Sequence, residues 1–333
     1  MSYLMPVYKA SDPAITQRPT STALLAIDSE DRFADYTVSR AVNRAAFNVL
    51  NATPYNFTIS KAESLLNGFL TRLAVTEINM PWAIPNINVK TNKIQWSAQV
   101  GPAPVTTGVI TLSMGFYTPS QLAATLQTAI RAATGIATFI LQYGNTLVAQ
   151  GNTPSFAYTT GTPGTDIAFS PMPANTAAYP YGANTKQLFD VLGFSIPGNS
   201  ILAPFAITNR YTFCQAVRYV DIVCLQLTYN QALKDTMSQS IARDSLCRIY
   251  LGDAGIPGNV DPSAPGFCPP GCAPFTIYRN FASPKQIQWL GNQPVPGKLA
   301  IEVYDDAGDL LSASIGADGE YLDWSMTLLV SEN

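Results

Sequence analysis

Strand-length apolar segments bounded by turn residues recur at both ends of this chain, and they constrain its fold more than any other feature. In the clearest of them every second residue is apolar, so one face of a strand carries Leu322, Trp324, Met326 and Leu328. Similar segments lie at 23–27, 55–59, 69–78, 219–229, 246–251, 275–281, 286–289 and 299–303. About eight antiparallel strands in two packed sheets predict a mainly β fold, a single jelly roll, with those four residues as anchors of its core.

The middle of the chain has a different pattern. The segment Thr118-Pro119-Ser120-Gln121 matches a capping box with proline at the first helical position. Leu122, Leu126 and Ile130 then recur on one face, which predicts an amphipathic helix to about residue 133 that Gly135 ends. The other elements expected here are a hairpin of residues 94–96 with 108–112, short strands at 139–143 and 147–149, and a short helix from Asn184 to Gly193.

Strand patterns of the jelly-roll type lie on both sides of this middle block, which predicts a small α+β domain inserted into a loop of the roll. Residues 1–91 are then the first part of the roll with an extended N-terminal arm, 92–208 the inserted upper domain, and 209–333 the second part of the roll. The length of 333 residues fits two domains.

Composition limits the partners. Charged residues make up 12% of the chain, its net charge is −3, and it contains no run of Lys or Arg. Such a chain lacks the positively charged surface that direct binding to nucleic acid requires. No segment approaches the ~20 apolar residues of a membrane span, and the N-terminus lacks the regions of a signal peptide, so we expect folding in the cytosol.

The chain contains no histidine. This excludes Ser/His/Asp and Cys/His catalysis and His-ligated metals, including the cupin use of a jelly roll. No catalytic, cofactor-binding or metal-binding residue is therefore expected, and an enzyme with carboxylates alone, such as a glycosidase, is a minor alternative. Acidic clusters occur at 28–31 and 305–309. We interpret the second as a tight turn, because it lacks calcium-loop spacing, and the first as a strand end with solvated charges.

Five cysteines do not form a secreted disulfide framework. Cys268 and Cys272 flank a Pro-Pro-Gly bend and could form a disulfide or contribute to a metal site. A constrained loop with free thiols is the favoured interpretation. The redox state of this thiol pair stays open.

Several short strings occur in a characteristic order. They are residues 24–32 (LLAIDSEDR), 53–59 (TPYNFTI), 81–82 with 85–88 (PW and PNIN), 115–119 (GFYTP), 188–194 (LFDVLGF), 302–308 (EVYDDAG) and 328–332 (LLVSE). With this order and spacing, the chain resembles the penton, or minor capsid, proteins of virophages, polinton-like viruses and large nucleocytoplasmic DNA viruses. The loop of Cys268 and Cys272 is not part of the resemblance.

The resemblance implies a structural, non-enzymatic protein of the virion. It would be a jelly roll with an upper insertion, assembled as a homopentamer at the fivefold vertex of an icosahedral capsid among neighbouring major capsid proteins. It would be synthesised in the host cytoplasm and would need no cofactor.

The alternative is a jelly-roll module that recognises a carbohydrate or a host receptor. Its aromatic contacts could come from Trp82, Trp96, Trp289 and Trp324. For Trp324, which lies on the apolar face of its strand, core packing is the favoured use.

Overall fold

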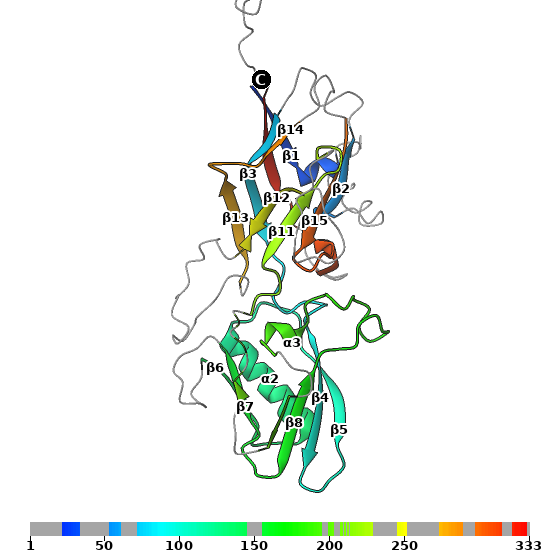
Figure 1. Cartoon of the computed structure of the whole chain (residues 1–333), viewed down its shortest axis with the longest axis vertical. Coiled ribbons are helices and arrows are strands. Elements are labelled where there is room, and N and C mark those ends of the chain that lie inside the picture. The colour runs from blue at the N-terminus through cyan, green and yellow to red at the C-terminus, as the bar shows by residue number, and fades with distance from the viewer. Residues whose placement is uncertain are drawn as a thin grey trace, which may run out of the picture.

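The computed structural model describes residues 22–33, 53–60, 72–144, 155–194, 199–202, 207–208, 210, 212, 214–228, 245–251, 273–288, 297–314 and 322–331. Within these residues the molecule is elongated and has two parts, one above the other in Figure 1. The upper part contains both ends of the described chain, and the lower part contains its middle.

Two antiparallel sheets form the upper part. The first sheet has the order β1 (Thr22–Asp28), β16 (Ser325–Ser331), β3 (Arg72–Trp82) and β13 (Phe275–Asn280), with β14 (Gln286–Gln288) also paired to β3. The second has the order β12 (Ser245–Tyr250), β11 (Tyr219–Val223), β15 (Lys298–Asp305) and β2 (Asn56–Ser60). Two short 3-10 helices follow β1 and β15, namely η1 (Ser29–Phe33) and η4 (Leu311–Ser314).

The strand pairing of this part is that of a jelly roll. Because β13 and β14 both pair with β3, they count as one strand, and eight strands then follow one another along the chain. The first pairs with the last, the second with the seventh, the third with the sixth and the fourth with the fifth. This is one long antiparallel hairpin rolled into two facing sheets. The predicted mainly β, jelly-roll fold class is therefore confirmed.

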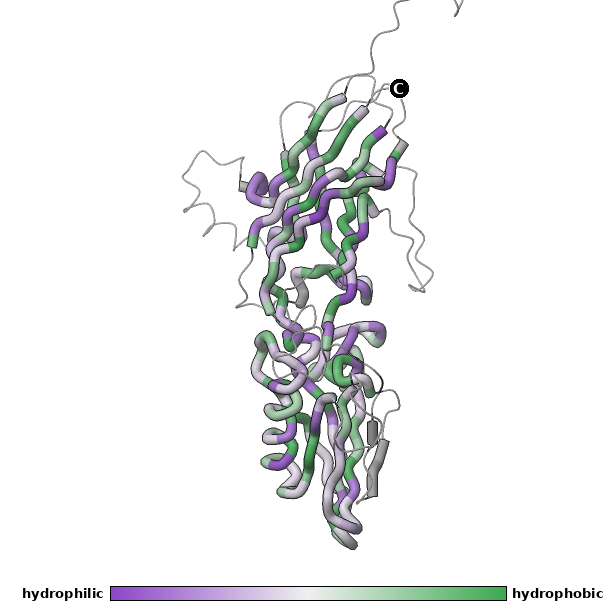
Figure 2. The backbone as a smooth tube through the Cα atoms, turned by 90° about the vertical axis from the view of Figure 1, so that its left-hand side faces the viewer, coloured by the Kyte–Doolittle hydropathy of each residue, from purple (hydrophilic) through white to green (hydrophobic). Residues whose placement is uncertain are grey.

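Alternating residues fill the space between the two sheets. Burial alternates residue by residue along β15 and β16. Figure 2 shows hydrophobic and hydrophilic residues alternating along strands of the upper part. The Trp324 side chain is 2% exposed; its Nε1 donates to the carbonyl oxygen of Pro54 at 2.6 Å, and its ring meets that of Phe57 edge-on at 6.2 Å. Met326 and Leu328 are buried in the same core.

Leu322 differs from the expectation, since it is 38% exposed and lies outside the core cluster. The ladder of β16 with β1 begins at Ser325. Leu322 precedes that strand by three residues. The alternation of apolar residues in the sequence therefore continues beyond the end of the sheet, where the Leu322 side chain is not held on a sheet face.

The lower part is built between β3 and β11. One of its antiparallel sheets has the order β5 (Thr106–Thr111), β4 (Lys93–Val100), β8 (Thr165–Ser170) and β9 (Asn199–Leu202). The other has the order β10 (Ile207–Thr208), β7 (Phe156–Thr159) and β6 (Ile140–Tyr143). The predicted β4–β5 hairpin is confirmed, whereas β7 to β10 were not anticipated. The strand expected at 147–149 lies outside the described residues.

Two helices complete the lower part, α2 (Pro119–Thr134) and α3 (Leu188–Val191). Both hydrogen bonds of the predicted capping box between Thr118 and Gln121 are present, and Gly135 ends α2 at φ 72°. The face with Leu122, Leu126 and Ile130 is buried, where α2 packs against β5 and β6. The prediction of this helix is confirmed. No helix in the described ranges is long and apolar enough to cross a membrane.

Each part has its own hydrophobic core. The roll core ends at Ile84 and resumes at Val217, whereas the lower core begins at Ile87 and includes Cys214. The change from one core to the other therefore falls between Ile84 and Ile87 and again between Cys214 and Val217.

Candidate functional site: the junction of the two cores

The acidic segment 305–309 forms the end of β15 that faces the lower part. Its backbone turns as predicted: the Asp305 carboxylate accepts hydrogen bonds from the backbone nitrogens of Ala307 at 3.0 Å and Asp309 at 2.8 Å, and Gly308 has a φ of 93°. No group of His, Cys, Asp or Glu in the described part of the chain is arranged to hold a metal ion. This segment is called the acidic turn below. Its hydrogen-bonded backbone directs the carboxylates of Asp305 and Asp309 toward the lower part of the molecule.

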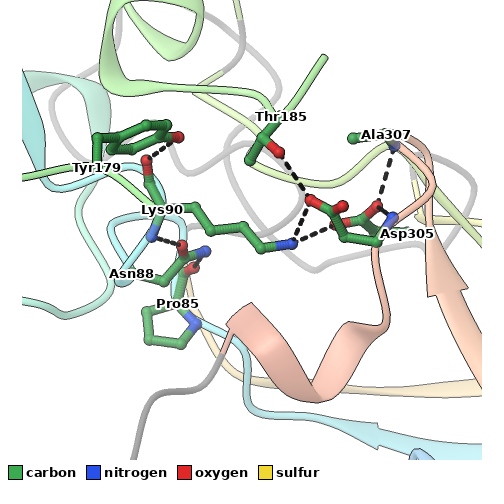
Figure 3. Close-up of polar contacts among 8 residues, drawn as sticks. Pro85, Asn88, Lys90, Tyr179, Thr185, Asp305 and Ala307 are labelled. Carbon is green, nitrogen blue, oxygen red and sulfur yellow. Dashed lines mark hydrogen bonds and ion pairs between the residues drawn. The ribbon is translucent and has the colours of Figure 1, made fainter. Parts of the chain in front are cut away.

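Lys90 of the lower part meets the acidic turn (Figure 3). Its Nζ lies 3.0 Å from Asp305 Oδ2 and 2.9 Å from Asp309 Oδ2. The side chains of Lys90 and Asp305 are 4% and 5% exposed, whereas that of Asp309 is 36% exposed. The Lys90–Asp305 pair is thus removed from water, and each charge depends on the other for compensation.

A compact turn holds Lys90 in place. Its backbone nitrogen donates to Asn88 Oδ1 at 2.9 Å, and its carbonyl oxygen accepts from the Tyr179 hydroxyl at 2.9 Å. On the other side of the pair, the Thr185 hydroxyl donates to Asp309 Oδ2 at 2.8 Å (Figure 3). Lys90 and Thr185, from two separate segments of the lower part, therefore contact the acidic turn.

Opposing effects set the pKa of Asp305. Burial raises this pKa, while the charge of Lys90 and the backbone hydrogen bond from Asp309 lower it. The carboxylate stays compensated only as long as the lysine is present.

Asn86 ties together the two chain segments that connect the parts. This buried side chain donates from Nδ2 to the carbonyl oxygens of Tyr117 at 2.8 Å and Cys214 at 3.2 Å. Its Oδ1 accepts from the Tyr117 nitrogen at 2.9 Å. The chain therefore leaves the roll and returns to it at almost the same place.

A second ion pair lies within the roll, beside the junction. Arg218 Nε lies 2.7 Å from Asp306 Oδ2, but the arginine side chain is 53% exposed. The Asp306 side chain is only 6% exposed, so water reaches this pair from the arginine side alone. Nothing local in the sequence distinguished Lys90 or Arg218 from a surface cation, so sequence reasoning missed both.

The acidic cluster at 28–31 lies at the end of β1, as expected, and the side chains of Asp28, Glu30 and Asp31 are half-buried. Asp28 Oδ1 accepts from the Glu30 nitrogen at 2.8 Å and so starts η1. Ser29 and Arg32 are buried, and both contact the Asp323 carboxylate. Ser29 and Arg32 thus join the end of β1 to the segment before β16, because a buried arginine requires a charged partner.

The aromatic and thiol residues singled out from the sequence are mostly in the cores. Trp82, Trp96 and Trp324 are buried, and so are the free thiols of Cys214, Cys224 and Cys247. Burial raises the pKa of both Cys224 and Cys247 to about 12. Cys268, Cys272 and Trp289 lie outside the described residues.

No protein-family model matches the sequence, and no curated protein sequence matches it significantly. Among solved structures, the chain is similar to the mavirus penton protein, with a TM-score of 0.47 and 12% identity over 94% of this chain and 100% of that one. It is also similar to a chain in the structure of the Sputnik virophage, with a TM-score of 0.40 and 12% identity over 93% of this chain and 97% of that one.

Proposed function

We propose that this protein is a non-enzymatic structural subunit of a virus particle, a penton that assembles as a homopentamer at the fivefold vertex of an icosahedral capsid. The observation that carries the proposal is the jelly-roll pairing of the strands, with the second core placed between the third and fourth strands. Jelly rolls serve as capsid subunits, lectins and cupins.

Two features favour the capsid among these uses. Cupins bind their metals through histidine, and the whole sequence has none. Among the tryptophans named for a lectin-like site, Trp82, Trp96 and Trp324 are buried and so cannot contact a sugar. The low content of charged residues, 12%, suits a surface that contacts other proteins.

The partners follow from this role. The subunit contacts copies of itself and the neighbouring major capsid proteins, in the virion, after synthesis in the host cytoplasm. Direct contact with the genome is not part of the role, because a net charge of −3 without a basic run does not attract a phosphate backbone.

The chain divides into a roll and an inserted domain. The roll comprises residues up to 85 and from 216, and the insert comprises 86–215, a range slightly wider than the 92–208 expected from the sequence. What supports this division is the position of Ile84 and Ile87 in different cores, and the hydrogen bond from Asn86 to the carbonyl oxygen of Cys214.

The pentamer contacts belong to the roll. Five copies around an axis need a heterologous interface that closes on itself and typically buries ~800 Å² on each partner, which calls for a rigid surface. The two facing sheets provide that rigidity.

Deletion of the insert tests both statements. Residues 86–215 are replaced by a short Gly/Ser linker, which can span the gap because the two connecting segments touch. We expect sedimentation and electron microscopy to show folded fivefold rings for the full chain and for the shortened one. A folded monomer from the shortened chain alone would place the contacts in the insert, and a monomeric full chain would contradict the penton role.

A further inference from the structure

A polar pocket of about 490 Å³ opens beside the junction, between the acidic turn and the segment that leads into α3. Although only 12% of the whole chain is charged, five of the eleven residues that line the pocket are charged. They are Asp190, Asp306, Lys186, Arg210 and Arg218. Because the rest of the chain has few charged residues, we interpret this cluster of charged side chains as a binding site for a ligand and not as part of a packed core.

Both carboxylates of the pocket already have partners within the protein. Asp306 Oδ2 accepts from Arg218 Nε at 2.7 Å. Asp190 Oδ2 accepts from the backbone nitrogen of Gln187 at 3.0 Å, at the start of α3. Neither carboxylate depends on a cation from outside.

The Lys186 amine is a buried cation of the pocket without an ion-pair partner among the described residues. It donates one hydrogen bond, to the carbonyl oxygen of Gln215, and no carboxylate of the described residues forms an ion pair with it. An ammonium group has three donors, so two of them remain for a ligand. Burial lowers the pKa of Lys186, and Asp306 opposes this effect from a longer distance. A bound anion would stabilise the charged amine.

Two arginines lie on the rim of the pocket. Arg210 donates from Nη2 to the carbonyl oxygen of Phe194 at 3.2 Å, which occupies one of the five donors of its guanidinium group. Arg218 approaches from the roll side, next to Asp306. Three cations against two carboxylates leave one positive charge in excess, in a chain whose net charge is −3.

We propose that this pocket binds a small oxyanion, either a free phosphate or a carboxylate group of another protein chain, with Lys186 as its anchor and Arg210 and Arg218 at its rim. Charge-assisted hydrogen bonds from these three groups match the several oxygens of such a ligand. Because the pocket is lined by both parts of the molecule, a bound anion also adds a bridge between the roll and the lower part.

Protection of Lys186 from chemical modification tests the proposal on the unsubstituted full-length chain. The lysines are acylated with an amine-reactive reagent, with and without inorganic phosphate, and the modified positions are measured by mass spectrometry. We expect phosphate at about tenfold above its dissociation constant to slow the acylation of Lys186 by about tenfold, because only about a tenth of the sites are then free. Lys93 is the internal control, since it also donates to a backbone carbonyl, that of Ala178 at 2.9 Å, but lies outside the pocket.

Matched variants test the same point by affinity. In calorimetric titrations with phosphate, Lys186→Gln should bind about tenfold more weakly, whereas Lys93→Gln should bind as the unsubstituted chain does. A parallel titration with glutarate distinguishes the two possible ligands of the pocket. Tighter binding of phosphate indicates that the ligand is a free phosphate ion, and tighter binding of glutarate indicates that it is a carboxylate group of another protein chain. If neither probe binds saturably, or if Lys186 is acylated equally fast with and without them, the proposal is wrong. If Lys186→Gln does not fold, the protection experiment decides alone.

Discussion

Replacement of Lys90 by methionine should destabilise the protein through the charge it leaves behind. The Asp305 side chain is 5% exposed and would lose its only ion-pair partner among the described residues. Removal of one partner from a buried pair typically costs about 3 to 5 kcal/mol of unfolding free energy. The second pair adds little, because Asp309 is 36% exposed and water can compensate its charge.

Urea unfolding followed by circular dichroism measures this effect, with two further variants. Asp305→Asn keeps an oxygen that can accept from the turn nitrogens but removes the charge, so Lys90→Met with Asp305→Asn should regain most of the loss and lie within about 1.5 kcal/mol of the unsubstituted protein. Lys93→Met, which changes a lysine with an exposed hydrogen bond, should change the stability by less than about 0.5 kcal/mol.

The penalty of Lys90→Met should depend on pH. Burial raises the pKa of Asp305 in the folded protein, and loss of the lysine raises it further. The folded state then holds a proton that the unfolded state releases above its ordinary pKa of about 4, so stability falls as pH rises from that value. The penalty should therefore be smallest at acid pH and largest near neutrality. A penalty below about 1 kcal/mol at neutral pH, or one that does not vary with pH, would refute a buried, mutually dependent pair.

Three other outcomes are expected. Trp324→Ala should lower the unfolding free energy by about 3 to 5 kcal/mol, because it empties a fully packed site, and unchanged thermal unfolding would contradict this. Gly193→Ala should destabilise far more than Gly135→Ala: both have positive φ, but only at Gly193 would a Cβ overlap a backbone carbonyl oxygen, that of Arg210. The Gly135 change should cost about 1 to 2 kcal/mol, and equal melting temperatures for the two variants would exclude the overlap. The oligomer size measured by light scattering should stay constant between pH 6 and 8. The chain has no histidine, and burial raises the pKa of its described thiols, so none of these groups changes charge in that window. A steep change in oligomer size between pH 6 and 8 would reveal another titrating group.

Elements with a local signal were predictable, and elements without one were not. Strands β15 and β16 have one face in the core and alternate accordingly, and α2 begins with its own capping residues. Strand β7 is buried at all of its residues, 156–159, so its sequence has no alternation that distinguishes a strand from any short apolar run. Strand β8 is buried at four of its six residues, three of them consecutive, so its alternation is also weak and this inner strand of the lower sheet was not anticipated.

The sequence by itself determined the local conformations of this protein: which segments are strands with one buried face, where the long helix starts and stops, and that residues 305–309 turn. These depend on side chains within a few positions of one another. Only the tertiary structure decided that the acidic turn contacts Lys90, which is 215 residues away from Asp305, and that the core of the roll ends at Ile84 and resumes at Val217. The physical reason is that a lone lysine has the same local sequence signal whether it is solvated or buried, and its partner is set by how the strands between the two residues pair and pack.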